Sequence, residues 1–252
     1  MVRREALEVA QRILLAVMVT IVLAIAYLIA QALWTPEREY ATSTPVVPTL
    51  TPTVTPTATP IPPSPTPTKP PKKIGIVAGH WSKDPRRYDP GAVCPDGLTE
   101  VGINLAVAQL VKVLLENRGY AVDLLEEFDT ALDGYQADAL VSIHADSCNI
   151  PEASGFKVAS VLHSAVPEEE DHLVKCLREE YQKATGLSFH AHSITYHMTE
   201  YHAFYEIAAQ TPGAIIETGF MAADRQILVD QQDKVVQGIT NGIICFLEND
   251  SD

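Results

Sequence analysis

Residues 35–71 limit which part of this 252-residue chain can fold, because they hold 12 of its 18 prolines together with 11 threonines. Thr-Pro pairs recur there with few apolar side chains between them, so the segment has no hydrophobic face to bury. Sequences of this kind favour extended polyproline II and act as spacers. We therefore predict a disordered linker over 35–71, which reaches about 115 Å at most, and a folded domain over 72–252.

Residues 13–34 precede the linker and contain no charged side chain. Twenty-two helical residues extend for about 33 Å, enough to cross the ~30 Å hydrocarbon core of a bilayer. Three arginines lie before this run, and the positive-inside bias then places residues 1–12 in the cytoplasm. We predict a single-pass anchor in the cell membrane. The alternative is a secreted protein whose signal peptide is cleaved near Ala32, and both interpretations export residues 35–252.

Acidic side chains dominate the predicted domain. Residues 1–71 hold five basic and four acidic side chains, which leaves 13 basic and 28 acidic ones and a net charge of −15 for residues 72–252. Proteins that bind nucleic acid need a basic surface to neutralise phosphates. We therefore exclude a nucleic-acid partner, and the oligomeric state stays open.

Short apolar runs alternate with amphipathic segments through residues 72–252. Patterns typical of buried strands occur at 74–77, 120–125, 139–143, 156–162 and 213–216. Helical patterns occur at 99–117, 167–185, 199–210 and 233–247. This alternation predicts an α/β fold, namely a single three-layer domain in which helices flank a largely parallel, twisted central sheet.

Side chains that can bind a metal follow three of the predicted strands. His80 follows the first strand, His144 the third and Glu217 the last, while Glu100 lies in the first turn of the first helix. Sites on parallel sheets form beyond the carboxyl ends of the strands, so we expect these residues to converge. Two histidines and a glutamate can bind zinc and leave a position for water. A second glutamate can then act as the general base.

Three separated blocks of sequence carry a more specific signal. They are Gly79-His80 with Asp89-Pro90-Gly91-Ala92 and Asp96-Gly97-Leu98-Thr99-Glu100, then Ser142-Ile143-His144-Ala145-Asp146, then Ile215-Ile216-Glu217-Thr218-Gly219-Phe220. In this order they resemble the zinc-dependent N-acetylmuramoyl-L-alanine amidases of the type-3 amidase family. The resemblance runs from about Lys73 to the C-terminus.

The resemblance implies that one catalytic Zn²⁺ is bound by His80, Glu100 and His144, and that Glu217 is the catalytic glutamate. It implies that the substrate is peptidoglycan, cut at the amide between N-acetylmuramic acid and L-alanine during wall remodelling or degradation. Two alternatives stay open. One is a catalytically weak domain that binds peptidoglycan or regulates another hydrolase, and the other is a zinc peptidase that cuts within the stem peptide.

The chain departs from the family pattern at three places. Trp81-Ser82 stands where two glycines are usual, and the loop that follows is longer, with Arg86, Arg87 and Tyr88 in the extra part. Asp146 stands where an asparagine is common. The shape of the substrate cleft is therefore open, and Trp81 could either stack on a sugar or cover the metal.

Four cysteines in an exported domain are compatible with disulfides. Cys94 and Cys148 fall in loops near the predicted site, where a bridge would join them. Cys176 and Cys245 fall in predicted helices, where we favour buried thiols over a second bridge. Four histidines cluster in one stretch without a zinc-binding spacing, and we interpret this stretch as a polar loop near the cleft: His190, His192, His197 and His202.

Overall fold

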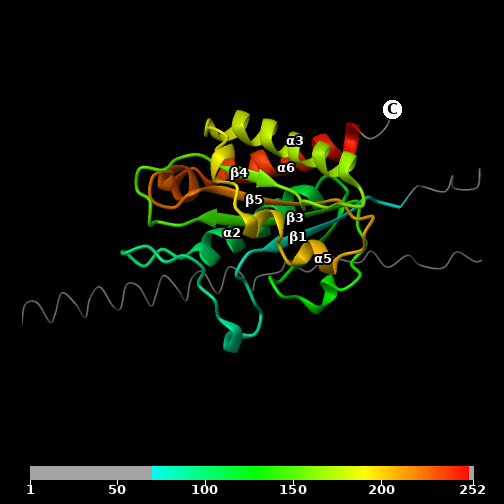
Figure 1. The fold of residues 1–252 in the computed structure, drawn as a ribbon, viewed down its shortest axis with the longest axis horizontal. Coiled ribbons are helices and arrows are strands. Elements are labelled where there is room, and N and C mark those ends of the chain that lie inside the picture. Colours follow the sequence, from blue (N-terminus) through cyan, green and yellow to red (C-terminus); the bar gives the residue numbers. More distant parts are fainter. Residues whose placement is uncertain (1–69, 250–252) are drawn as a thin grey trace, which may run out of the picture. The chain divides into compact units, whose positions relative to one another are not determined.

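A five-stranded sheet in the order β2-β1-β3-β5-β4 forms the centre of the part of the chain that the structure describes, residues 70–249 (Figure 1). The structure is a computed structural model. The predicted cytoplasmic segment 1–12 and anchor 13–34 lie outside the described residues, and so does almost all of the linker 35–71. Within residues 70–249, no helix has both the length and the apolar character that a membrane span requires.

The sheet is largely parallel, as the alternation of elements predicted. Strands β1 (Lys73–Ala78), β2 (Ala121–Leu125), β3 (Ala139–Asp146) and β5 (Gly213–Phe220) pair in parallel. The last strand, β4 (Lys157–Ala159), runs antiparallel to β5 and is shorter than the predicted 156–162. Antiparallel edge strands on parallel sheets are common.

Strands β3 and β5 continue past the ends that their apolar runs predicted, residues 143 and 216. They pair with each other as far as Asp146 and Phe220. Polar side chains interrupt the apolar pattern there, but backbone hydrogen bonds continue the ladder regardless of side-chain polarity. His144 and Glu217 therefore lie inside strands, paired in register, and not in the loops that follow them.

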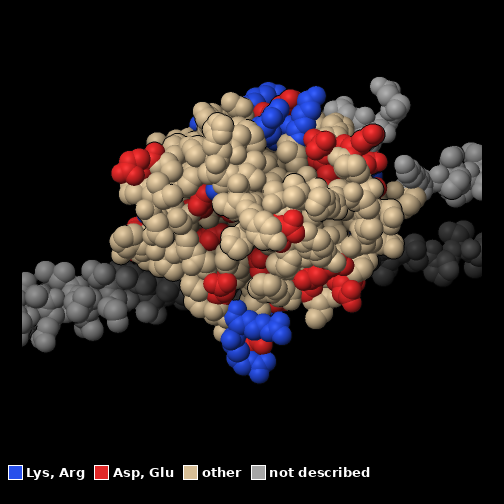
Figure 2. All heavy atoms as spheres, in the orientation of Figure 1, with Lys and Arg blue, Asp and Glu red and all other residues tan. Residues whose placement is uncertain are grey.

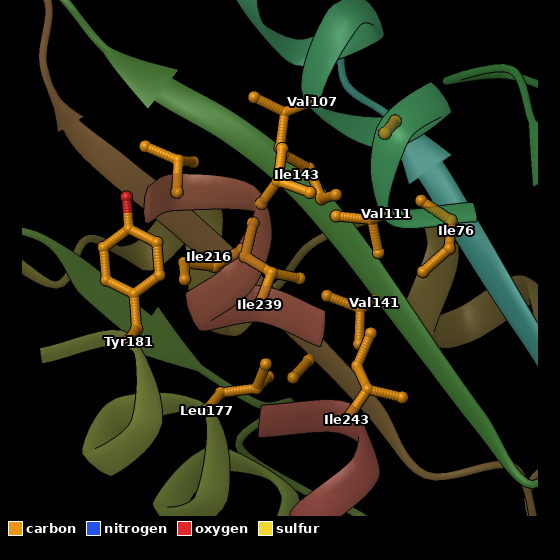
Figure 3. Close-up of a cluster of buried hydrophobic side chains, with 14 of the residues drawn as sticks. Ile76, Val107, Val111, Val141, Ile143, Leu177, Tyr181, Ile216, Ile239 and Ile243 are labelled. Carbon is orange, nitrogen blue, oxygen red and sulfur yellow. The ribbon is translucent and has the colours of Figure 1, made fainter. Parts of the chain in front are cut away.

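Three long helices, α2 (Glu100–Glu116), α3 (Pro167–Thr185) and α6 (Gln232–Asn249), enclose one core with one face of the sheet. Their residue ranges agree closely with the predicted ones. Local signals explain the bounds of α3, since Pro167 begins it and Gly186 ends it with a φ of 76°. Figure 3 shows side chains from helices and strands converging in this core: Val107, Val111, Leu177, Tyr181, Ile239 and Ile243 from the helices, and Ile76, Val141, Ile143 and Ile216 from the strands.

Short elements cover the opposite face of the sheet. They include η2 (Thr130–Leu132), α4 (Tyr196–Thr199) and α5 (Ala203–Glu206). The single helix predicted over 199–210 is therefore wrong. The chain leaves the helical path around Tyr201, whose buried hydroxyl accepts a hydrogen bond from Ser142 on β3 at 3.0 Å. This contact with the sheet outweighs the local helical periodicity.

Two disulfides join segments that are distant in sequence. Cys94 is bonded to Cys148, which confirms the predicted bridge between the two loops. Cys176 on α3 is bonded to Cys245 on α6, so the prediction of buried thiols is wrong for this pair. The packing of α3 against α6 brings the two Cα atoms to 5.7 Å, which is a usual separation for a disulfide.

The remaining short helices are η1 (Pro85–Arg87), η3 (Ala191–Ser193) and the π-helical η4 (Gln226–Asp230). Basic side chains form a small projection at the lower edge of Figure 2, where Figure 1 places η1. The extra residues of the longer first loop therefore extend away from the sheet as a basic tip.

The contact between α3 and α6 predicts the effect of replacing Gly242 by alanine. A Cβ at Gly242 would come within 2.7 Å of the Cα of Leu177. Alanine usually stabilises a helix interior by up to ~1 kcal/mol relative to glycine, but overpacking a core costs about 1–3 kcal/mol. We expect Gly242→Ala to lower the free energy of unfolding in urea titrations. The control is Gln237→Ala at an exposed position of the same helix, and a Gly242 variant that is more stable than the unmodified protein would contradict the packing.

Candidate functional site

Side chains on β3 and β5 alternate between the two faces of the sheet, and this alternation places two of the predicted residues together. Ile143 and Ile216 face the core under the long helices. Their neighbours His144 and Glu217 therefore face the opposite side, and the two are paired in register across the strands. Two residues of different motifs thus lie side by side on the face covered by the short helices.

His80 follows β1 after a single glycine. A Cβ at Gly79 would lie 2.3 Å from the ring of His144, so only glycine allows the two histidines to approach. His80 has a φ of 62°, the left-handed region that non-glycine residues rarely adopt. Its backbone N–H donates to Glu127 Oε2 at 2.8 Å, and its ring Nδ1 lies 2.8 Å from Asp89 Oδ2.

Glu100 is the first residue of α2 and reaches the two histidines from the helix N-terminus. Its Oε2 lies 3.3 Å from His80 Nε2, and its Oε1 lies 3.1 Å from His144 Nδ1. The carboxylate also accepts hydrogen bonds from the Ala92 N–H at 3.0 Å and from Asn104 Nδ2 at 3.3 Å. A buried carboxylate is thus held in place between two imidazole rings.

His80, Glu100 and His144 each offer a ligand atom, and these atoms lie within 4.8 Å of one another. Two imidazole nitrogens and one carboxylate oxygen form a donor set typical of catalytic zinc sites. Within residues 70–249, the histidine-rich stretch contributes to no comparable group. The structure therefore brings together the three predicted ligands and provides a donor set that fits a zinc ion.

The electrostatics of this group also suit a cation. A hydrogen bond with Glu100 raises the pKa of His80 to about 9, against an opposing effect of burial. Burial disfavours the charge on Glu100, but hydrogen bonds from both histidines hold its pKa well below the usual range. Burial likewise opposes the charge on His144, yet the surrounding carboxylates raise its pKa. The carboxylates thus favour positive charge on both rings, which is the compensation that a bound divalent ion supplies.

Glu217 differs from Glu100 in that burial outweighs the positive groups near it, His144 and Lys157, which lower its pKa. Its Oε2 is buried and has no hydrogen bond within the described part of the protein. Burial raises the pKa of Glu217 to about 7. A carboxyl group with such a pKa can both accept and release a proton near neutral pH.

All four predicted residues line one cavity of about 480 Å³. Another part of the cavity wall comes from the segment around α4 and includes His197, Tyr201 and His202. The prediction of a polar loop near the cleft therefore holds for His197 and His202. His190 instead bonds to Ser193 within its own turn.

Comparison with known proteins identifies the family. The sequence profile described as N-acetylmuramoyl-L-alanine amidase (Amidase_3) matches residues 74–245. The chain belongs to this amidase family. The match covers nearly the whole described part of the chain, including the four predicted residues that line the cavity.

Solved amidases share the fold of this family member. CwlD from Clostridioides difficile, solved in complex with the GerS lipoprotein, is 22% identical with a TM-score of 0.54, and the match covers 71% of this chain and 99% of that one. Ami1 from Mycobacterium smegmatis is 20% identical with a TM-score of 0.56 over 71% of this chain and 97% of that one.

A relative found by sequence is AmiC from Neisseria meningitidis. It is 37% identical over 79 residues, which are 28% of this chain and 19% of that protein.

The structure explains one departure of this amidase-family chain from the common pattern. Asp146, which stands where asparagine is common, forms an ion pair with the buried ammonium of Lys157 on β4. An opposite charge stabilises a buried charge, and an asparagine at position 146 would remove this ion pair. Trp81 packs against the core, and together with His80 it lines a small cavity of about 50 Å³.

Sequence reasoning missed Glu127 and Tyr201 as members of the site. Glu127 lies just past the predicted strand 120–125, where the strand-end argument could have found it. The run Glu126-Glu127-Phe128-Asp129 instead has the composition of an exposed acidic loop. Tyr201 carries no local signal, because its position depends on contacts with Ser142 on β3 and with Glu127.

Two glycines with positive φ provide a test of how Glu100 is held. A Cβ at Gly91 would lie 2.6 Å from Glu100 Oε2, whereas a Cβ at Gly97 would meet nothing within 4 Å. Both alanine variants strain the backbone by about 1–2 kcal/mol, but only Gly91→Ala displaces the carboxylate. We expect Gly91→Ala to weaken zinc binding about tenfold or more and Gly97→Ala to leave it nearly unchanged, measured by competition with a chromophoric chelator. Equal affinities in both variants would contradict this role of Gly91.

Proposed function

We propose that this chain hydrolyses the amide bond between N-acetylmuramic acid and L-alanine in peptidoglycan, with one Zn²⁺ bound by His80, Glu100 and His144. The observation that carries the proposal is the position of Glu217 beside these three residues in one cavity. Membership of the amidase family supports the choice of bond and substrate.

In this mechanism the metal supplies Lewis acidity, since a bound zinc ion polarises a carbonyl and lowers the pKa of water towards roughly 7. Glu217 removes the proton from the attacking water and delivers it to the departing amine of L-alanine. With a cation held by His80, Glu100 and His144, Glu217 would have a pKa below the value of about 7 that burial produces. Glu217 is then ionised and ready to accept a proton at neutral pH.

The enzyme acts outside the cytoplasm in this proposal. Residues 13–34 anchor it to the cell membrane, and the linker 35–71 lets the domain 72–252 reach the wall. Two disulfides within the described domain support an exported location, because disulfides persist in oxidising compartments. The size of the mature protein in cells distinguishes the uncleaved anchor from a signal peptide cleaved near Ala32.

Replacing Glu217 by glutamine tests the proposed general base. Glutamine keeps the shape of the side chain but cannot accept the proton, so we expect kcat for stem-peptide release to fall by about 10²–10⁴. Zinc content should stay stoichiometric, because Glu217 is not a ligand in this proposal. Glu116→Gln, at the exposed end of α2, is the matched control. Near-normal release by the Glu217 variant would exclude the assigned role.

Metal removal and product analysis test the reaction itself. We expect chelator-treated protein to release no stem peptides from purified peptidoglycan and stoichiometric zinc to restore release. The new amine terminus should be that of L-alanine, identified by labelling and mass spectrometry. A terminus within the stem peptide would indicate a zinc peptidase instead, and no cleavage at any metal concentration would indicate a binding or regulatory domain.

A further inference from the structure

Glu127 is a buried carboxylate beside the candidate metal group. The proposed chemistry does not use this residue. It follows β2, and only 7% of the residue is exposed. Its backbone N–H donates to the carbonyl of Trp81 at 3.0 Å, which ties it to the loop after His80. A carboxylate that is removed from water in this way needs compensating contacts.

The two oxygens of Glu127 have different partners. Oε2 faces the metal group: it accepts the backbone N–H of His80 at 2.8 Å and lies 3.5 Å from Nε2 of His144. Oε1 faces the cavity wall: it accepts the hydroxyl of Tyr201 at 3.0 Å and lies 3.2 Å from Nε2 of His202. One side chain therefore connects both histidines of the metal group to the segment that covers them.

The orientation of His144 explains the role of Oε2 of Glu127. Its Nδ1 faces Glu100, so its Nε2 is the nitrogen that points away from the metal group. This Nε2 is buried without a hydrogen bond within the described part of the protein, and Glu127 is its nearby acceptor. Metal-binding histidines typically donate their second ring N–H to a carboxylate or carbonyl, which fixes the tautomer and the ring orientation.

His80 has the same arrangement with a different partner. Its Nε2 faces Glu100 and its Nδ1 contacts Asp89. Glu127 acts on His80 through the backbone. The His80 N–H donates a hydrogen bond to Glu127 Oε2 at 2.8 Å, and this bond holds His80 at its φ of 62°. Backbone strain of this kind persists only where surrounding contacts hold it in place.

We propose that Glu127 is a positioning residue of the metal site. It accepts the Nε2–H of His144 and holds the backbone of His80, so that His144 Nδ1 and His80 Nε2 both face the ion. Its negative charge also adds to the attraction for a cation. This inference rests on the proposed metal site but assigns a residue that the proposed reaction does not need.

The neighbouring residue provides a matched control. Glu126 is also a partly enclosed carboxylate, but its Oε2 accepts hydrogen bonds from the Ser82 hydroxyl and the Lys83 N–H, both at 2.8 Å. Its contacts therefore stabilise the loop and do not reach the metal group. Glu127→Gln and Glu126→Gln remove the same charge from adjacent positions of one segment, and only the first changes the support of His144.

The experiment measures the Zn²⁺ affinity of the full-length protein and of both variants by competition with a chromophoric chelator. We expect Glu127→Gln to bind Zn²⁺ about 10–100-fold more weakly than the unmodified protein, and Glu126→Gln to differ by less than about threefold. The visible absorption spectrum of the Co²⁺ form should keep its shape in Glu127→Gln, because the ligands are unchanged. Circular dichroism of the metal-free proteins checks that all are folded.

Each outcome separates this inference from the proposed function. If the unmodified protein binds no Zn²⁺, the proposed metal site itself fails. If it binds Zn²⁺ and Glu127→Gln binds equally well, only the positioning role is excluded. A changed Co²⁺ spectrum would make Glu127 a ligand and overturn the inference as stated. If the glutamine variant does not fold, Glu127→Asp replaces it, because aspartate keeps the charge but is shorter by one methylene. A Zn²⁺ affinity of Glu127→Asp equal to that of the unmodified protein would also overturn the positioning role.

Discussion

The parallel pairing of β3 with β5 is the constraint on which the rest of the site depends. It places His144 and Glu217 in register on one face of the sheet. A shift of one residue in either strand would turn one of these side chains into the apolar core. The core under the long helices prevents that shift, because Ile143 and Ile216 are fully buried in it. Hydrophobic packing on one face thus fixes polar geometry on the other.

Negative charge accumulates around this geometry. Glu100, Glu127 and Glu217 lie within reach of two histidines, in a domain whose net charge is −15. Hydrogen bonds and burial divide their roles: Glu100 stays ionised between the rings, while burial raises the pKa of Glu217 to about 7. An acidic domain offers no general attraction to anionic wall polymers. In the proposed function, capture of peptidoglycan would then depend on the cavity and on where the linker 35–71 holds the domain.

The covering segment around α4 and α5 shows how contacts with the sheet override local preference. Its sequence has helical periodicity, but Tyr201 and His202 turn towards β3 and Glu127. Of the helix predicted over 199–210, only α5 and the last residue of α4 are helical. The same segment also lines the cavity that holds the candidate metal group. A continuous helix over 199–210 would not have allowed the contacts of Tyr201 and His202 with β3 and Glu127. The interruption of the helix therefore contributes to the shape of the cavity.

The sequence by itself determined the α/β class, the bounds of the three long helices and the four residues that meet in the cavity. Those features depend on periodicity and on motif residues at strand ends, which are local properties of the chain. Only the tertiary structure decided the position of Glu127, the break at Tyr201 and the Cys176–Cys245 bridge. Each depends on which segments, far apart in the sequence, lie close together in space. A local sequence pattern does not say which segments these are. The physical reason is that local propensities favour individual helices and strands, whereas tertiary packing decides which of them are in contact.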